Sequence, residues 1–303
     1  MIDLPQSLLE PLQQALIQIG VTDPVVSARA LSGGCINNAR HIRTAQDEFF
    51  LKWNASISSD VFSAEAHGLK LLEVANAVRA PKVLAVGSSS DNAFPSFLLL
   101  EWLSPEPGHT NRLDPGLFGE QLAALHQTTQ QNYGLERNNY IGPTPQINRW
   151  EADWVTFYRD SRLQPQIELA ASLGNLSAQR RRGLETLLDR LDCWLSHVRR
   201  KPSLLHGDLW SGNVIPGPLS EPVLIDPAVY YGDREAELAY TELFGGFGAR
   251  FYQAYESAMP LEPGYSDRRD IYNLYHLLNH LNLFGEGYGL QIDLILRRYI
   301  GQS

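Results

Sequence analysis

The chain has 303 residues, 44% of them hydrophobic, so it can bury a core large enough for one large or two modest domains. Its 34 acidic and 25 basic side chains give a net charge of −9, which argues against nucleic acid as a partner. Its two cysteines, Cys35 and Cys193, are too few for a disulfide framework, so we expect a reducing compartment such as the cytoplasm. The N-terminal segment lacks the pattern of a signal peptide, and no apolar run approaches the roughly 20 residues of a membrane span.

The N-terminal third predicts a small lobe built from a sheet. Apolar residues at helical spacing predict a first helix through Leu8, Leu12, Leu16 and Ile19. Alternating apolar patterns then predict a five-stranded antiparallel sheet with one further helix. The predicted strands cover residues 25–31, 40–45, 48–53, 81–87 and 96–103, and the helix covers residues 60–75.

A proline- and glycine-rich segment, residues 104–116, marks a change from strand-like to helix-like sequence. We therefore predict an N-terminal lobe over residues 1–103 and a mostly helical lobe over residues 104–303, an α+β chain with two lobes. In the second lobe, helical periodicity covers residues 117–129, 149–163, 177–200, 234–243 and 267–284, and short strands are expected at 202–208, 212–216 and 222–226.

The segment LLHGDLWSGNVI places Asp208 and Asn213 at the D-x-x-x-x-N spacing of kinase catalytic loops. In such a loop the carboxylate accepts the proton of the attacking hydroxyl, and the carboxamide oxygen binds the Mg²⁺ that bridges the nucleotide phosphates. Asp226 ends the next apolar strand and adds a second oxygen ligand for a hard cation. The alternative is a pair of polar turns whose side chains bond to their own backbone.

Lys52 lies inside an apolar strand, so its ammonium group needs a counter-charge if that face is covered. Glu65, on the following helix, is the expected partner. Kinases use such a lysine and glutamate to position the α- and β-phosphates of the nucleotide. The alternative is an exposed lysine whose aliphatic stem covers apolar surface. The order of these motifs along the chain favours a kinase.

The strand and linker at residues 96–108 lie between the two predicted lobes, where the adenine ring of a nucleotide would form hydrogen bonds with the backbone. The candidate groups are Glu101 C=O and Leu103 N–H, on either side of Trp102. A plain buried strand leading into a linker has the same composition. The hairpin turn SGGCINNA has neither G-x-G-x-x-G nor a Walker A motif, but Gly33 and Gly34 allow backbone N–H groups to approach a phosphate.

Two other groups of residues invite a chemical interpretation. His276 and His280 share a helix face, but the glutamate of H-E-x-x-H is absent, so packed histidines are favoured over a zinc site. Cys193 is expected to be a small core residue of an amphipathic helix.

Taken together, these motifs resemble the fructosamine kinase (ketosamine-3-kinase) family, relatives of aminoglycoside phosphotransferases and choline kinases with a protein-kinase-like fold. The resemblance runs nearly end to end and is carried by FFLKWN, LAALHQ, NNYIGPTPQIN, HGDLWSGN, LIDPAVYYGDREAELA and YNLYHLLNHLNLFG. It implies ATP-dependent phosphorylation of the sugar 3-hydroxyl of a ketosamine, after which the adduct falls apart and frees the amine. The alternatives are a phosphotransferase for an aminoglycoside, choline or another small alcohol, and a catalytically silent nucleotide-binding protein.

The resemblance also implies roles for single residues. Asp208 is then the base, Asn213 and Asp226 are the Mg²⁺ ligands, Lys52 and Glu65 position the phosphates, and Glu101 to Leu103 form the adenine hinge. Trp210 resembles the family's sugar-contacting tryptophan, although a wedge between loop and helix is an equal alternative. Asp233 either contacts the amine of the substrate or, as we prefer, caps the helix that follows it.

The hairpin turn departs from the family pattern, because Ser32 replaces the first of its three glycines. Cys35 matches a position where some relatives carry a redox-sensitive cysteine. The resemblance therefore implies a monomer or, under oxidation, a dimer linked through Cys35. It does not specify which ketosamine is preferred, or whether the ketosamine is free or attached to a protein.

Overall fold

The computed structural model describes residues 2–31, 37–56, 58, 60–88, 93–104, 106, 112–196 and 201–301. The chain divides into two compact units. Unit 1 comprises Met1–Asp114, Asn139–Pro143 and Asn213–Ala228, and unit 2 comprises Pro115–Asn138, Thr144–Gly212 and Val229–Ser303. The sequence predicts a single boundary after residue 103, whereas two later segments of the chain also group with unit 1.

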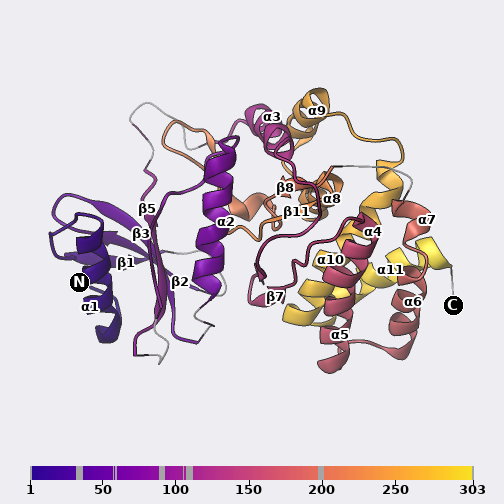
Figure 1. Ribbon diagram of the computed structural model, residues 1–303, viewed down its shortest axis with the longest axis horizontal. Coiled ribbons are helices and arrows are strands. Elements are labelled where there is room, and N and C mark those ends of the chain that lie inside the picture. Colours follow the sequence, from indigo (N-terminus) through magenta and orange to yellow (C-terminus); the bar gives the residue numbers. More distant parts are fainter. Residues whose placement is uncertain are drawn as a thin grey trace. The chain divides into compact units, whose positions relative to one another are not determined.

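Unit 1 is built on a five-stranded sheet in the order β1-β2-β3-β5-β4, with every neighbouring pair antiparallel. Helices α1 (Gln6–Gln18) and α2 (Val61–Ala75) lie on opposite sides of this sheet (Figure 1). The predicted sheet and both predicted helices are confirmed. The strands are β1 (Ser27–Ala30), β2 (Asn38–Arg43), β3 (Glu48–Asn54), β4 (Val83–Gly87) and β5 (Ser96–Glu101).

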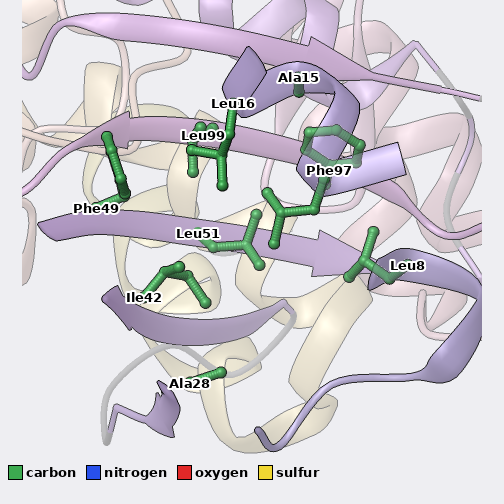
Figure 2. Close-up of a cluster of buried hydrophobic side chains, with 10 residues drawn as sticks. Leu8, Ala15, Leu16, Ala28, Ile42, Phe49, Leu51, Phe97 and Leu99 are labelled. Carbon is green, nitrogen blue, oxygen red and sulfur yellow. The ribbon is translucent and has the colours of Figure 1, made fainter. Parts of the chain in front are cut away.

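Strand alternation decides which side chains each helix covers, because successive side chains point to opposite faces of a sheet. Figure 2 shows Phe49, Leu51, Phe97 and Leu99 packed with residues of α1 in one buried cluster. The cluster consists of Leu8, Leu12, Ala15, Leu16, Ala28, Ile42, Phe49, Leu51, Phe97 and Leu99. Lys52, which follows Leu51, therefore points to the other face, toward α2.

A hairpin formed by β9 (Val214–Pro216) and β10 (Pro222–Leu224) also belongs to unit 1, together with β6 (Asn139–Ile141). Arg79 holds this hairpin. Its guanidinium group donates to Glu221 at 2.5 Å and to Glu101 at 3.3 Å, and its C=O accepts the Leu224 N–H at 2.8 Å. The hairpin is therefore tied to the end of β5, which explains why it groups with a sheet far from it in the sequence.

Unit 2 is mostly helical. Its helices are α3 (Pro115–His126), α4 (Trp154–Tyr158), the π-helix Arg159–Leu163, α5 (Gln164–Ser172), α6 (Ala178–Leu188), α7 (Asp192–Leu195), α8 (Arg234–Leu243), α9 (Ala249–Ala258), α10 (Tyr265–Phe284), the 3₁₀ turn η3 (Glu286–Tyr288) and α11 (Gly289–Ile300). Its strands are β7 (Thr144–Gln146), β8 (Ser203–Leu205) and β11 (Tyr230–Gly232), with β8 and β11 antiparallel. Within the described ranges, no helix has the length and apolar character needed to cross a membrane.

Some predicted helices of unit 2 differ from the observed ones. The helix predicted over residues 177–200 is interrupted between α6 and α7, where the backbone tightens and the Arg190 N–H donates to Leu187 C=O at 3.1 Å. Helices α5, α9 and α11 are not predicted. Helix α9 has Phe251, Ala254, Tyr255 and Ala258 at helical spacing, so the periodic pattern is present in the sequence although the prediction does not include it.

Candidate active site

Lys52 lies at the centre of a buried charge cluster in unit 1. Its side chain, on β3, is 6% exposed, and its Nζ donates to Glu65 Oε1 at 2.6 Å and also to the Asp226 carboxylate. Burial alone lowers the pKa of Lys52, but the charges of Asp226 and Glu65 and their hydrogen bonds raise the pKa overall, so Lys52 stays an ammonium ion. The predicted pairing of Lys52 with Glu65 is confirmed, and the alternative of an exposed lysine is wrong.

Glu65 and Asp226 differ in their surroundings. The Glu65 side chain is 12% exposed, and burial raises its pKa although Lys52 opposes the shift. The Asp226 side chain is 44% exposed, so part of that carboxylate faces solvent. One ammonium group thus serves two carboxylates, and the cluster keeps an excess negative charge on its open side, which suits a cation ligand.

The β9–β10 hairpin brings Asn213 and Asp226 to the same end. Asn213 ends the 3₁₀ turn η2 (Ser211–Asn213), and its C=O accepts the Ile225 N–H at 3.0 Å, next to the paired residues Val214 and Leu224. Asp226 has a φ of +57°, a left-handed conformation that is uncommon for a residue with a side chain and clusters at functional sites. A carboxamide and a carboxylate at one end of a hairpin fit Mg²⁺, which takes one or two protein oxygens and fills its other positions with water and phosphate oxygens.

Asp208 belongs to unit 2 and follows β8 in the loop that leads to Asn213. Its N–H donates to His206 Nδ1 at 3.3 Å. The Asp208 carboxylate is half-buried. Burial raises the pKa of the Tyr240 phenol on α8, and the charge of Asp208 raises it further, so Asp208 lies near a helix that is distant in sequence.

A buried network holds the backbone of this loop. Gly207, at φ +84°, donates its N–H to Glu237 Oε1 at 2.7 Å. The other oxygen of Glu237 lies 2.9 Å from His126 Nε2, and His126 Nδ1 lies 2.7 Å from the Tyr255 hydroxyl. Burial tends to raise the pKa of Glu237, but the His126 hydrogen bond and charge, the charge of His206 and the Gly207 N–H lower it overall. An ionised carboxylate thus fixes the position of the loop just before the predicted base.

The sequence interpretation missed the roles of His126 and Glu237. His126 lies in the segment LAALHQ and Glu237 lies in REAELA, so both residues belong to recognised motifs but had no assigned function. The usable signal was a charged residue between Ala236 and Leu238, because a glutamate flanked by apolar residues in a helix needs a partner when that helix is buried.

The predicted adenine hinge is ordered by side-chain contacts in unit 1. Glu101 ends β5, its N–H donates to Lys82 C=O at 3.0 Å, and its Oε1 accepts the Lys82 N–H at 3.0 Å. The Trp102 ring stacks on His41 with centroids 3.9 Å apart and an interplanar angle of 16°. Contact of Glu101, Trp102 and Leu103 with adenine stays a prediction. The predicted phosphate-binding residues Gly33 and Gly34, and the predicted dimer residue Cys35, lie outside the described residues.

The sequence model of the fructosamine kinase family matches residues 11–302. This chain belongs to the fructosamine kinase family. It is 42% identical over 272 residues to a Synechocystis sp. protein named probable ketoamine kinase, covering 89% of each chain. It is 39% identical over 293 residues to a protein-ribulosamine 3-kinase, chloroplastic, of Oryza sativa subsp. japonica, covering 96% of this chain and 84% of the rice protein.

Solved structures agree with this membership. A Haemophilus somnus 129PT protein assigned as a fructosamine-3-kinase superposes with a TM-score of 0.85 at 31% identity, covering 95% of this chain and 96% of that chain. A thermostable mutant of the aminoglycoside phosphotransferase APH(4)-Ia, in a ternary complex with ADP and hygromycin B, superposes with a TM-score of 0.64 at 17% identity, covering 98% of this chain and 100% of that chain. The second likeness concerns the fold alone. The predicted family and the two-lobed, protein-kinase-like α+β fold are confirmed.

Trp210, the residue that resembles the family's sugar-contacting tryptophan, is 41% exposed in unit 2. Its indole lies so close to Gly212 that a Cβ there would stand 2.3 Å from the ring. Glycine therefore permits this position of the indole beside the loop. Contact of Trp210 with a sugar stays a prediction, and its open face agrees with that prediction better than with a buried wedge.

Asp233 caps helix α8, as we preferred. Its Oδ1 accepts the Glu235 N–H at 3.0 Å, and its Oδ2 accepts the Tyr272 hydroxyl at 2.6 Å. The residue is 1% exposed. The predicted cap is confirmed. A contact between Asp233 and the amine of a family substrate stays a prediction, and the burial of its carboxylate does not favour it.

The two histidines of α10 are packed, as expected. His276 is 5% exposed and stacks on Tyr240 with centroids 3.4 Å apart and an interplanar angle of 7°, and His280 Nδ1 lies 2.8 Å from His276 C=O. The expectation for Cys193 is wrong, because this cysteine is exposed. It lies in the short helix α7, which buries only Leu195.

The buried imidazole of His276 predicts a pH-dependent stability. Burial lowers the pKa of His276 well below its usual value, and the charges of His280 and Arg162 lower it further. Below about pH 6.5 the His276 side chain binds a proton in the unfolded chain but not in the folded chain. The free energy of unfolding therefore falls as the pH drops, by up to about 1.4 kcal/mol per pH unit.

We expect the free energy of unfolding in urea to drop more for the wild type than for His276→Phe between about pH 7.5 and about pH 5, by about 2 kcal/mol. Phenylalanine keeps an aromatic ring against Tyr240 and removes only the titration. Between about pH 7.5 and about pH 9 the two proteins should show parallel curves, because His276 is neutral in both states there. Parallel curves in the acidic range as well would show that His276 is protonated in the folded protein.

Proposed function

We propose that this protein is an ATP-dependent kinase that phosphorylates the sugar 3-hydroxyl of ketosamines. The observation that carries the proposal is the cluster of Lys52 with Glu65 and Asp226, in a chain that belongs to the fructosamine kinase family. A lysine held between a helix glutamate and a hairpin aspartate is the arrangement with which kinases hold nucleotide phosphates and their cation.

The proposal assigns a task to Lys52 and Asp226 of this cluster and to Asn213 and Asp208. Lys52 would contact the phosphates, and Asn213 and Asp226 would hold Mg²⁺, which neutralises charge on the transferred phosphoryl group when it is bound. Asp208 would accept the proton of the sugar hydroxyl as that oxygen attacks the γ-phosphate. Catalysis then depends mostly on positioning and on charge stabilisation, because the protein has little covalent chemistry to perform in phosphoryl transfer.

The remaining predicted residues would bind the rest of the two substrates. The backbone of Glu101, Trp102 and Leu103 would bond to adenine, and the turn of Gly33 and Gly34 would approach the phosphates. Trp210 would lie against the sugar ring. We propose a monomer, or a dimer linked through Cys35 under oxidation, in the cytoplasm.

The substrate class includes ketosamines on protein lysines. The rice relative is named a protein-ribulosamine 3-kinase, and that name supports a protein-bound sugar as acceptor. Phosphorylation at the 3-hydroxyl would then start the removal of the sugar from the lysine. In a protein-bound acceptor, the lysine and the protein that carries it have to remain outside the site that binds the sugar. A free ketosamine and a glycated peptide should therefore both be phosphorylated.

The test is a panel of acceptors assayed for ADP release, with mass spectrometry of the product. We expect turnover of a ribulosamine and a fructosamine, free and on a lysine peptide, to exceed turnover of kanamycin and choline at least about 100-fold in kcat/KM. The unmodified peptide is the matched control. Faster turnover of kanamycin or choline would assign another acceptor, and no ADP release with any acceptor would indicate a silent nucleotide-binding protein.

A further inference from the structure

The indole of Trp102 has no role in the function proposed above, which assigns the backbone of this hinge residue to adenine binding. The ring stacks face to face on the imidazole of His41, with centroids 3.9 Å apart and an interplanar angle of 16°. His41 belongs to β2, and Trp102 directly follows β5. Strand β3 separates β2 from β5 in the sheet, so this aromatic contact attaches the hinge to a strand that is not its neighbour.

The strand register places His41 on the face of the sheet that carries Lys52. His41 pairs with Phe50 of β3, and Phe50 pairs with Leu100 of β5. Lys52 follows Phe50 by two positions, and side chains two positions apart in a strand share a face. The stack on Trp102 therefore connects the hinge to the face of the sheet on which the phosphate-binding lysine lies.

The imidazole of His41 is itself held in place. Its Nε2 lies 3.2 Å from Oε2 of Glu48, the first residue of β3, and the side chain is 17% exposed. The other oxygen of Glu48 accepts a hydrogen bond from Arg43 Nε at 3.0 Å. Contacts across the β2–β3 hairpin thus fix the ring against which Trp102 packs, as a positioning group requires.

Glu101, the residue before Trp102, is held by separate contacts. Its carboxylate accepts the Lys82 N–H at 3.0 Å and a hydrogen bond from the Arg79 guanidinium group at 3.3 Å. Its own N–H donates to Lys82 C=O at 3.0 Å. The side chains of both residues therefore restrict the backbone between Glu101 C=O and Leu103 N–H, which is the stretch that has to match the nucleotide base.

Adenine and guanine present opposite hydrogen-bonding patterns to such a backbone. Adenine donates from its 6-amino group and accepts at N1, whereas guanine accepts at O6 and donates from N1. Glu101 C=O and Leu103 N–H match adenine. A hinge that can change its conformation can present other backbone groups to guanine, but a fixed hinge leaves the mismatched groups unpaired, which costs binding free energy.

We propose that His41 is a specificity-determining residue for the nucleotide base, because its stack on Trp102 holds the hinge in the conformation that accepts adenine and excludes guanine. His41 acts through Trp102 and is therefore a positioning residue. This inference rests on the proposed contact of adenine with the backbone of Glu101 and Leu103.

The test measures the Kd values of ADP and GDP with Mg²⁺ by isothermal titration calorimetry, without an acceptor. In His41→Leu the Kd for ADP should rise about 3- to 10-fold, because the lost aromatic pair no longer orders the hinge. The Kd for GDP should change less than about twofold, so the ratio of the GDP Kd to the ADP Kd falls. In the kinase assay the KM for ATP should rise while kcat stays within about twofold of the wild type, since the base is bound equally in the ground state and the transition state.

Two further variants show whether the stack itself is responsible. His41→Phe keeps a ring against Trp102 and loses the contact with Glu48, and it should keep the ratio of the two Kd values within about twofold of the wild type. If His41→Leu does not fold, Trp102→Leu removes the same stack from the other side and should lower the ratio to the same extent.

Phe94→Leu is the matched control. It removes a ring from another aromatic pair of unit 1, in which Phe94 and Phe97 have centroids 6.4 Å apart. Phe97 belongs to the buried cluster with α1, on the face of the sheet opposite Lys52. The Kd values of ADP and GDP should both stay at their wild-type values in this variant.

The binding measurement separates this proposal from the proposed function. If no ketosamine is phosphorylated but the ratio falls in His41→Leu, the acceptor is wrong and the role of His41 stands. A wild type that binds neither nucleotide overturns the proposed function and the role of His41 with it. A wild type that binds ADP, with an unchanged ratio and a lower melting temperature in His41→Leu, shows a purely structural role and overturns this proposal alone.

Discussion

Replacing Asp208 with asparagine is expected to lower kcat by about 10²- to 10⁴-fold while the Kd for ATP changes by less than about threefold. Asparagine has nearly the same shape as aspartate, and the hydrogen bond from the Gly207 N–H to Glu237 remains, so the loop should keep its position. It cannot accept the proton of the sugar hydroxyl. The change therefore removes the base and leaves nucleotide binding, and stopped-flow ATP binding together with steady-state ADP release measures both effects.

The control for this prediction is Asp189→Asn, which makes the same chemical change at an exposed residue after α6. It should leave both kcat and the Kd for ATP at their wild-type values. Near-normal turnover of Asp208→Asn would refute the role of Asp208 as the base. An equal loss of ATP affinity and of turnover would instead indicate that Asp208 acts on the nucleotide.

The contact of Lys52 with Glu65 could be predicted because it depends on local rules. Alternation along β3 places Lys52 on the face opposite Leu51, and the helix that follows in the chain supplies a carboxylate for that face. The contact of Lys52 with Asp226 could not be predicted in this way. These residues are 174 positions apart, and the placement of Asp226 depends on the Arg79 contacts that join the β9–β10 hairpin to the sheet.

The buried charges of helix α8 show a second limit of prediction from sequence periodicity. Three of the first four residues of helix α8 are charged. In an amphipathic helix, charged residues are expected to face solvent. In the structure Arg234, Glu235 and Glu237 are all buried, since each charge finds a partner in a distant segment. Periodicity detects where apolar residues gather, but it does not detect a helix whose charges are buried in pairs.

Replacing Lys52 with methionine is expected to lower the free energy of unfolding by about 3 kcal/mol, because it leaves two carboxylates without their shared cation. The open side of Asp226 keeps the cost at the lower end of the usual range for a broken buried pair. The double variant Lys52→Met/Glu65→Gln should recover most of this loss and remain inactive, since stability needs charge balance and phosphate binding needs the ammonium group. Lys70→Met, at an exposed position of α2, is the control and should change stability by less than about 0.5 kcal/mol.

The pH dependence of the free energy of unfolding of Lys52→Met tests whether Lys52 balances the charge of Glu65. Burial already raises the pKa of Glu65 in the wild type, and without Lys52 the pKa rises further. The folded variant then binds a proton that the unfolded chain releases, so its stability increases as the pH falls toward the unfolded pKa of about 4.3. Urea unfolding should therefore show the deficit of Lys52→Met against the wild type shrinking between about pH 8 and about pH 5. A deficit that stays constant over this range, with no recovery in the double variant, would mean that the two carboxylates do not depend on Lys52 for their charge balance.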